Sequence, residues 1–283
     1  MKLGFIGAGK AGCSFSRYLQ GTQAEISGFY SKTLKHSEQA AEDTEAAVFL
    51  CLRQVVSASD VVLITTPDNM IGEIWKQIKE QCPGLLSGKT FCHMSGSLSS
   101  ELFQERQKFG AYGCSLHPMQ AISSKNADLS GAFFTAEGDQ EAVSLMKALL
   151  TEKGNPVAVM DPANKKKYHM AASTASNLMA GLAQMAIGSL VECGFDQDVA
   201  LRMLGPLMRG NMENICEKGV LAALTGPVER GDCETVRSHL AQLTGEKREI
   251  YRLLSRQLVE VAQKKNETRD YSNLKTILEE KDQ

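Results

Sequence analysis

The sequence predicts an α/β domain built on a parallel-rich sheet, followed by an all-α domain at the carboxyl terminus. Short β-branched runs alternate with helical stretches up to about residue 160, and no strand-like run follows. A glycine-rich turn comes directly after the first strand-like run. Because alternating strands and helices are typical of a parallel sheet covered on both faces, we expect two domains, at residues 1–160 and 161–283.

The expected elements follow this division in order. In the first domain, strands are expected at residues 3–7, 26–30, 61–65, 90–94, 112–117, 133–136 and 157–160. Helices are expected between most of these strands, including residues 12–20, 69–80 and 140–153. In the second domain, helices are expected at residues 161–193, 197–217, 234–243, 246–264 and 272–280. Asp161 as N-cap and Pro162 at the first helical position favour a helix that begins there.

The composition is typical of a soluble globular protein, with 43% hydrophobic and 23% charged residues. The net charge of −2 gives no basic surplus for nucleic acid, and no apolar run is long enough to cross a membrane. A strand-like run begins at Lys2 and leaves no room for a separate signal peptide, so we expect a cytoplasmic protein. The eight cysteines include no C-x-x-C pair and are expected to be free, buried thiols, and no metal-ligand spacing is visible.

The glycine-rich turn matches the pattern G-x-G-x-x-G and predicts dinucleotide binding. It reads Gly7-Ala8-Gly9-Lys10-Ala11-Gly12. The first glycine allows the tight turn, the second lets backbone N–H groups approach a pyrophosphate, and the third lets the helix pack close to the strand. The N-terminus of the helix that follows offers unpaired N–H groups and a partial positive charge. The alternative is a glycine-rich turn that binds no ligand.

The end of the second strand indicates which dinucleotide is bound. An NAD site usually carries an Asp or Glu there, which bonds the ribose 2′-hydroxyl. Here Ser31, Lys32 and Thr33 follow the strand, and no carboxylate is present. These side chains can donate hydrogen bonds and positive charge to a 2′-phosphate, so we predict NADP rather than NAD. Alternatively, the three residues only cap the following helix.

Three further strand ends carry polar or turn residues. In an open α/β sheet, ligands bind beyond the carboxyl ends of the strands, so Thr66, Pro67, Ser95 and Gly96 are expected to contact the cofactor. Ser95 and Gly96 suit the nicotinamide or its ribose. His93 and His117 end two of these strands and are candidates for proton transfer. The alternatives are a strand histidine satisfied by a carbonyl and a structural turn before a proline.

The segments "GFIGAGKAG", "HMSGS", "LHPMQ", "YHMAASTASN" and "LTGPVERGD", within residues 4–232, resemble an uncharacterised oxidoreductase family. Its members join a Rossmann-like NADP domain to a helical domain of unknown function. More distantly, the chain is similar to prephenate dehydrogenase, pyrroline-5-carboxylate reductase, ketopantoate reductase and 3-hydroxyisobutyrate dehydrogenase. The resemblance implies a Rossmann-like fold, a homodimer formed through the helical domain, and an active site between the two domains. It implies no particular substrate.

The segment "YHMAASTASN" carries a polar stripe along one predicted helix. His169, Ser173 and Asn177 are spaced by four and would share one face. Hydroxyacid dehydrogenases of the wider group use a K-x-x-x-N pair here; Asn177 matches the Asn, but Ser173 stands where the Lys is expected. His169, or one of the lysines at 165–167, is then the substitute. The alternative is structural, with serine and threonine hydroxyls bonding back to helix carbonyls.

The carboxyl-terminal segment at residues 224–232 is expected to be a turn, in which Gly226 ends one helix, Pro227 begins another and Asp232 caps the next. Turn chemistry leaves Arg230 unexplained, so we take it as a candidate contact for a substrate carboxylate. The sequence thus predicts an NADP-dependent oxidoreductase acting on a small-molecule carbonyl, imine or alcohol. The rival hypothesis is a non-catalytic NADP-binding redox sensor or interaction protein.

Overall fold

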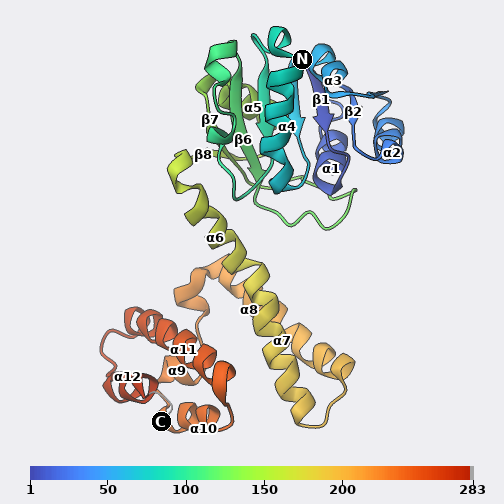
Figure 1. Cartoon of the computed structure of the whole chain (residues 1–283). Helices are drawn as coiled ribbons and strands as arrows, with labels where there is room; N and C mark the ends of the chain where they lie inside the picture. Colours follow the sequence, from blue (N-terminus) through green and yellow to red (C-terminus); the bar gives the residue numbers. More distant parts are fainter. Residues whose placement is uncertain (281–283) are drawn as a thin grey trace. The chain divides into compact units, whose positions relative to one another are not determined.

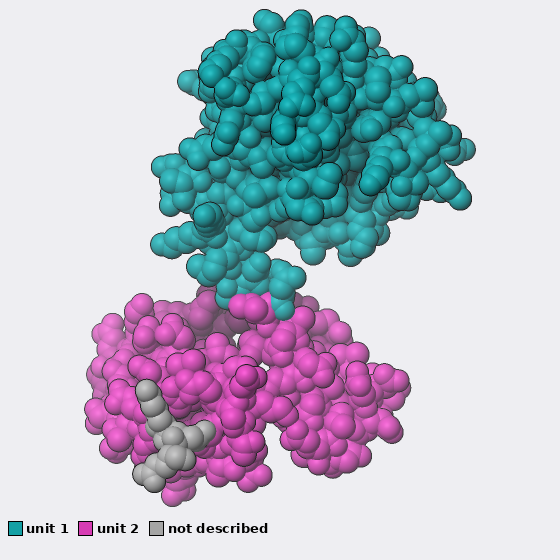
Figure 2. Space-filling view, viewed as in Figure 1, with its two compact units in different colours: residues 1–177 teal, residues 178–283 magenta. Residues whose placement is uncertain are grey.

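The computed structural model describes residues 1–280 of the chain. The chain divides into two compact units, the first spanning Met1–Asn177 and the second beginning at Leu178, which are coloured separately in Figure 2. The first unit holds the sheet, and the second consists of helices. The boundary predicted near residue 160, between a cofactor domain and a substrate domain, stays a prediction.

The sheet has eight strands in the order β3-β2-β1-β4-β5-β6-β7-β8 (Figure 1). The strands are β1 (Lys2–Ile6), β2 (Glu25–Tyr30), β3 (Ala47–Val48), β4 (Val61–Ile64), β5 (Thr90–His93), β6 (Tyr112–Pro118), β7 (Phe134–Gly138) and β8 (Val157–Val159). The run from β3 to β6 is parallel and has the Rossmann strand order. The predicted fold class, a Rossmann-like parallel-rich sheet followed by helices, is confirmed.

Two details of the sheet were not predicted. The two-residue strand β3 is too short to give a pattern of alternating side chains. The strand β7 runs antiparallel to β6, and the connection at residues 119–133 contains no helix. Parallel neighbours usually need a helical crossover, whereas antiparallel neighbours do not, so the missing helix accounts for the reversal.

Helices cover both faces of the sheet, as expected for strands that are apolar on both sides. They are α1 (Lys10–Tyr18), α2 (Leu34–Thr44), α3 (Leu52–Ala58), α4 (Asp68–Gln81) and α5 (Gln140–Glu152). On one face, Phe5 of β1 packs in a buried cluster with Phe15 of α1. On the other face, Ile6 packs in a second cluster with Trp75 of α4. Burying each of these side chains stabilises the fold by roughly 2 kcal/mol.

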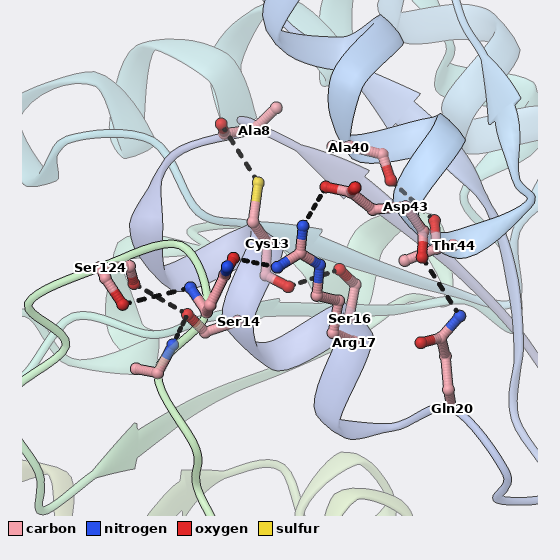
Figure 3. Close-up of polar contacts among 12 residues, drawn as sticks. Ala8, Cys13, Ser14, Ser16, Arg17, Gln20, Ala40, Asp43, Thr44 and Ser124 are labelled. Atoms are coloured by element: carbon pink, nitrogen blue, oxygen red, sulfur yellow. Dashed lines mark hydrogen bonds and ion pairs between the residues drawn. The ribbon is translucent and has the colours of Figure 1, made fainter.

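The connection between β6 and β7 is fastened to α1, as Figure 3 shows. The Ser14 hydroxyl donates to the carbonyl of Ser124 at 3.0 Å and accepts from the backbone N–H of Ala127 at 3.2 Å. On the next turn of α1, Arg17 pairs with Asp43 of α2. The Ser14 bonds hold the connection that follows the His117 strand against the helix that follows the glycine-rich turn.

The predicted helix at residues 161–193 is not continuous, and this expectation was wrong. The structure contains a 3₁₀ turn, η4 (Pro162–Asn164), then α6 (Lys165–Ala175) and α7 (Asn177–Glu192). Ser176, between the two helices, has φ −123° and ψ −74°. Its hydroxyl donates to the carbonyl of Ala172 at 2.7 Å. Serine side chains that bond backbone carbonyls compete with helix geometry, which is the structural alternative raised for this segment.

The second unit is helical throughout its described part. Its further helices are α8 (Gln197–Ala223), α9 (Pro227–Arg230), α10 (Cys233–Ala241), α11 (Gly245–Lys265) and α12 (Ser272–Glu279). Two parts of the turn prediction are confirmed: α9 begins at Pro227, and the Asp232 carboxylate accepts from the backbone N–H of Thr235 at 3.0 Å. The third part was wrong, because α8 already ends at Ala223 and Gly226 is instead the N-cap residue of α9. A small core of Val228, Val236 and Tyr271 joins α9 to α12.

The remaining helical surface of this unit is unusually apolar. Only Ile187 of α7 is buried, while Leu178 is 60% exposed and Leu207 of α8 is 69% exposed. The expectation of buried thiols is partly wrong, because Cys51, Cys193 and Cys216 are exposed. All eight cysteines are free, as predicted. Within residues 1–280, no helix is long and apolar enough to cross a membrane.

Candidate cofactor and active site

The glycine-rich turn has the close packing that its pattern predicts. A Cβ atom on Gly7, whose φ is +108°, would lie 2.8 Å from the carbonyl carbon of Thr65. A Cβ atom on Gly12 would lie 2.6 Å from the Gly7 carbonyl oxygen. By contrast, a Cβ atom on Gly9 would meet nothing within 4 Å. Two glycines are therefore fixed by the fold, and the third faces open space at the N-terminus of α1, where a diphosphate can approach.

A pocket of about 690 Å³ lies beside this turn. Its walls include the predicted contacts Gly7, Ala8, Gly9, Ser31, Lys32, Thr66 and Pro67. Other predicted contacts are absent from its walls: Lys10, Ala11 and Gly12 lie in α1, Thr33 is the N-cap residue of α2, and Ser95 and Gly96 follow β5. Sequence reasoning missed Tyr30 and His36, which also line the pocket. The available signal was the position of His36 in the first turn of α2, just after the second strand.

The chemistry of the pocket fits a phosphorylated dinucleotide. None of its lining residues is acidic, while Lys32 follows β2 and His36 lies in the first turn of α2. The Thr66 hydroxyl is buried and, among the described residues, has no hydrogen-bond partner. An unpaired buried hydroxyl is destabilising unless a ligand bonds it. The open N-terminus of α1 therefore suits the diphosphate, and the basic side chains of Lys32 and His36 suit the 2′-phosphate. The Thr66 hydroxyl suits a ribose or amide group.

A buried polar row crosses the sheet at the ends of three strands. His93 of β5 pairs in register with Ser115 of β6, which pairs in register with Glu137 of β7. All three are fully buried, and directly paired residues point to the same face of a sheet. Lys165 of α6, which is 1% exposed, donates from Nζ to the Ser115 hydroxyl at 2.7 Å. Burial lowers the pKa of this ammonium, and the Glu137 charge offsets part of the effect.

The His93 ring is bonded to the backbone on both sides. Its Nδ1 accepts from the N–H of Ser95 at 3.2 Å, which leaves Nε2–H to donate to the Ser99 carbonyl at 3.3 Å. Burial lowers the pKa of His93 to about 4, so the ring is neutral near pH 7. Since neither nitrogen is free, His93 holds the turn after β5 in place. This arrangement corresponds to the structural alternative raised for this residue.

His117 and His169 meet over Gly96. A Cβ atom on Gly96 would lie 2.7 Å from Nε2 of His117 and 2.8 Å from Nδ1 of His169. The two nitrogens are therefore no more than about 5.5 Å apart, by the geometry of those two contacts. His169 Nδ1 is buried and lacks a partner among the described residues. The His117 Nδ1 bonds the Tyr168 hydroxyl at 2.7 Å, so its Nε2 is the free nitrogen.

The turn after β5 is bonded to a carboxylate of α4. Asp68, at the start of α4, accepts from the hydroxyls of Ser95 at 2.7 Å and Ser97 at 2.9 Å. The Ser95 hydroxyl also accepts from the backbone N–H groups of Ser97 and Leu98. Ser95 is thus fully engaged in shaping the turn that carries Gly96, and the Asp68 charge is held by hydroxyl donors.

Three other predicted site residues are half-buried or exposed. Ser173 is half-buried and, among the described residues, has no side-chain hydrogen bond. Asn177 is exposed at the start of α7 and accepts from the Ser176 hydroxyl at 3.0 Å. Arg230 is exposed at the end of α9. In the described part of the chain, no group of His, Cys, Asp or Glu side chains is arranged to hold a metal ion.

Two family models match separate parts of the sequence. Residues 1–87 match the oxidoreductase family with an NAD-binding Rossmann fold. Residues 132–258 match a domain of unknown function, DUF2520. No curated protein has a matching sequence.

Solved structures share the fold over nearly the whole chain. Protein TM1727 from Thermotoga maritima is 26% identical, with a TM-score of 0.76 over 94% of this chain and 100% of that chain. Protein BF3122 from Bacteroides fragilis, provisionally assigned as an NADP oxidoreductase, is 23% identical, with a TM-score of 0.68 over 92% and 98%. Pyrroline carboxylate reductase from Plasmodium falciparum, with NADP bound, is 12% identical, with a TM-score of 0.60 over 94% and 96%. The chain thus carries an NAD-binding Rossmann-fold domain of the oxidoreductase family, joined to a helical DUF2520 domain.

Proposed function

We propose that this protein is an NADP-dependent oxidoreductase acting on a small-molecule carbonyl, imine or alcohol. The convergence of His117 Nε2 and His169 Nδ1 on Gly96 carries the proposal. His117 is near the carboxyl end of β6 and Gly96 follows β5, so the two nitrogens converge at the carboxyl edge of the sheet whose first turn lines the nucleotide pocket. Solved structures of the same fold include an imine reductase from Myxococcus stipitatus in complex with NADP⁺ and a reductive aminase from Aspergillus terreus with NADPH.

In this proposal, different residues of the chain bind the cofactor and transfer the proton. When bound, the nicotinamide cofactor supplies the two-electron chemistry. The N–H groups at the start of α1 bind the diphosphate, and Lys32 and His36 bind the 2′-phosphate. His117 and His169 hold or move the proton at the substrate oxygen or nitrogen. Burial, reinforced by the nearby Lys165 charge, lowers the pKa of His117 to about 4, so its ring acts as a neutral donor or acceptor.

Alanine substitution of either histidine is expected to lower turnover far more than cofactor affinity. A screen of small keto acids, aldehydes, cyclic imines and hydroxyacids, followed by NADPH absorbance, identifies the substrate. With that substrate, His117→Ala and His169→Ala should each reduce kcat by about 10²–10⁴-fold, the usual contribution of a positioned acid or base. NADP affinity should stay within about twofold, because neither histidine lines the nucleotide pocket.

His239→Ala is the matched control, since His239 lies in the second unit and bonds Tyr251. Unchanged turnover in both site variants would contradict the assignment. If the wild-type protein binds NADP tightly and turns over no compound of the screen, the rival hypothesis of a non-catalytic NADP-binding redox sensor gains support instead.

Lys32→Ala is expected to weaken NADP binding roughly 10–150-fold and to leave NAD binding unchanged. The reason is that a charge-assisted bond to phosphate contributes roughly 1.5–3 kcal/mol, and NAD has no 2′-phosphate. Calorimetric titration with both nucleotides measures this difference. Lys35→Ala, a neighbouring exposed lysine outside the pocket, is the control. Equal wild-type affinities for NADP and NAD would overturn the cofactor assignment.

The proposed active form is a cytoplasmic homodimer assembled through the helical unit. The apolar side chains exposed on α7, α8 and α11 support it, including Leu178, Leu182, Leu207 and Leu254. Exposed apolar surfaces larger than those of ordinary monomers commonly mark protein interfaces. Arg230, on the same unit, is the candidate contact for a substrate carboxylate.

A further inference from the structure

Behind His117 lies a connected set of polar side chains that the binding of substrate and cofactor does not explain. The Tyr168 hydroxyl bonds His117 Nδ1 at 2.7 Å, with the two rings perpendicular and their centroids 5.6 Å apart. The Lys165 ammonium lies 5.6 Å from the centre of the Tyr168 ring and bonds the Ser115 hydroxyl. The chain of contacts runs from Ser115 through Lys165 and Tyr168 to His117.

The backbone geometry of two elements brings these groups together. Ser115 and His117 are two apart on β6, so their side chains leave the same face of the sheet. Lys165 and Tyr168 are three apart on α6, so they lie on the same face of the helix. The two residues of α6 therefore meet the two residues of β6, so that Lys165 contacts Ser115 and Tyr168 contacts His117.

A role in packing alone does not account for Lys165. Removing an ammonium group from water costs several kcal/mol, and an apolar side chain of similar length fills the same space without that cost. Lys165 is nevertheless 1% exposed, with Ser115 as its hydrogen-bond acceptor. Its charge acts on both His117 and the Tyr168 ring. Burial raises the pKa of the Tyr168 hydroxyl and so disfavours a phenolate. A buried cation near the ring acts in the opposite direction, because it favours negative charge on the tyrosine.

We propose that Tyr168 relays a proton to His117, and that Lys165 is the positioning residue that stabilises the phenolate formed on Tyr168. This inference rests on the proposed oxidoreductase function. In the direction that forms an alcohol or amine, the Nε2–H bond of His117 breaks as the new O–H or N–H bond forms on the product. The Tyr168 O–H proton moves to Nδ1, so His117 stays neutral and Tyr168 becomes negative. A solvent proton restores Tyr168 after the product leaves, and oxidation runs the same steps in reverse.

The relay needs a neutral His117, because an imidazolium ring has no nitrogen that can accept a proton. The charged or titratable groups around His117 are Lys165 and His169 on α6, Asp68 on α4 and His93 on β5. The Lys165 cation and the burial of the ring disfavour protonation, while the Asp68 carboxylate favours it. The balance lowers the pKa of His117 to about 4, which keeps one ring nitrogen free to accept.

Nitrogen-15 NMR of the His117 ring in the full-length protein tests the relay without a substrate. In the wild type, we expect one dominant tautomer; in Tyr168→Phe, we expect a mixture, because Nδ1 loses its partner. In Lys165→Met, the pKa of His117 should rise by about one unit, because a neighbouring positive charge is lost. An unchanged tautomer and an unchanged titration in the two variants would overturn the proposal.

The chain contains its own control for this experiment. Tyr251 bonds His239 Nδ1 at 2.8 Å in the second unit, with the rings also nearly perpendicular. Tyr251→Phe removes a hydroxyl from an equivalent pair and should leave the His117 spectrum unchanged. Like Tyr168→Phe, the Tyr251→Phe variant loses one hydrogen bond, so both variants should show a similar, modest loss of stability.

Kinetics with the substrate found in the screen provide the second measurement. Tyr168→Phe is expected to reduce kcat about 10–100-fold, to change the pH dependence of kcat, and to leave KM and NADP affinity near wild-type values. A kcat equal to that of Tyr251→Phe would contradict the relay. Failure of the wild type to turn over any compound counts against the proposed function, whereas the NMR result still decides the relay geometry.

Discussion

A Gly7→Ala variant is expected to lose both global stability and NADP binding. The methyl group would lie 2.8 Å from the carbonyl carbon of Thr65 and 2.9 Å from the backbone nitrogen of Thr66, and neither backbone atom can rotate away. The φ of +108° adds strain for any residue with a Cβ atom. We expect a loss of at least about 3 kcal/mol in the free energy of unfolding, measured by urea denaturation.

Substitutions at two other glycines distinguish the backbone clash from the positive φ, and the loss of stability from the loss of NADP binding. Gly21→Ala also requires a positive φ, of +78°, but its methyl group meets nothing within 4 Å, so a loss of only about 1 kcal/mol is expected. Gly9→Ala has open space in the fold and should keep wild-type stability. Its methyl group would occupy the approach of the diphosphate, so NADP binding should fall sharply. Wild-type stability in Gly7→Ala, or wild-type NADP affinity in Gly9→Ala, contradicts this account of the turn.

Acid is expected to destabilise the protein between pH 6.5 and about pH 4, with His93 as a main cause. The ordinary pKa of 6.5 applies in the unfolded chain, whereas burial lowers the pKa of His93 to about 4 in the folded state. Between these values the unfolded chain binds a proton that the folded chain does not. The stability is therefore fully present above pH 6.5 and is lost as the pH falls through the folded pKa.

The expected loss from His93 alone is about 3 kcal/mol, from the difference between the two pKa values. Urea denaturation at a series of pH values measures it. His93→Gln keeps a donor for the Ser99 carbonyl but does not titrate, so its stability should depend less on pH across this window. His36→Gln, at an exposed position on α2, is the matched control for the loss of a histidine side chain. Identical pH profiles for His93→Gln and the wild type contradict the assignment.

Much of the fold was predictable because its signals are local in the sequence. The glycine-rich turn, the apolar strands and the helices between them depend on neighbouring residues, and their order matches the structure. The antiparallel strand β7 was not predicted, because strand direction depends on how the chain returns along residues 119–133. The break at Ser176 was missed as well, since small residues such as Ala172 are compatible with a continuous helix.

The sequence predicted which strand ends form the candidate site, but it did not predict which side chains meet there. His117 and His169 were each proposed from their own segments, but their convergence on Gly96 depends on where α6 lies over β6. Lysines at 165–167 were considered only as a group, and the sequence does not show which one is buried. Tyr168 was missed entirely, although its position one turn after Lys165 on α6 placed it on the same face.

Because the helix is broken at Ser176, the residues proposed to handle the proton and the helices after Leu178 belong to different units, which can evolve separately. Since α6 ends at Ala175, the groups proposed to handle the proton, namely Lys165, Tyr168 and His169, lie in the same compact unit as His117. The four side chains are therefore positioned within one unit, and we expect substitutions in the helices after Leu178 to leave the distances among them unchanged. Such a chain can acquire new substrates or new association partners by changing one unit, while the proton-handling groups are inherited unchanged.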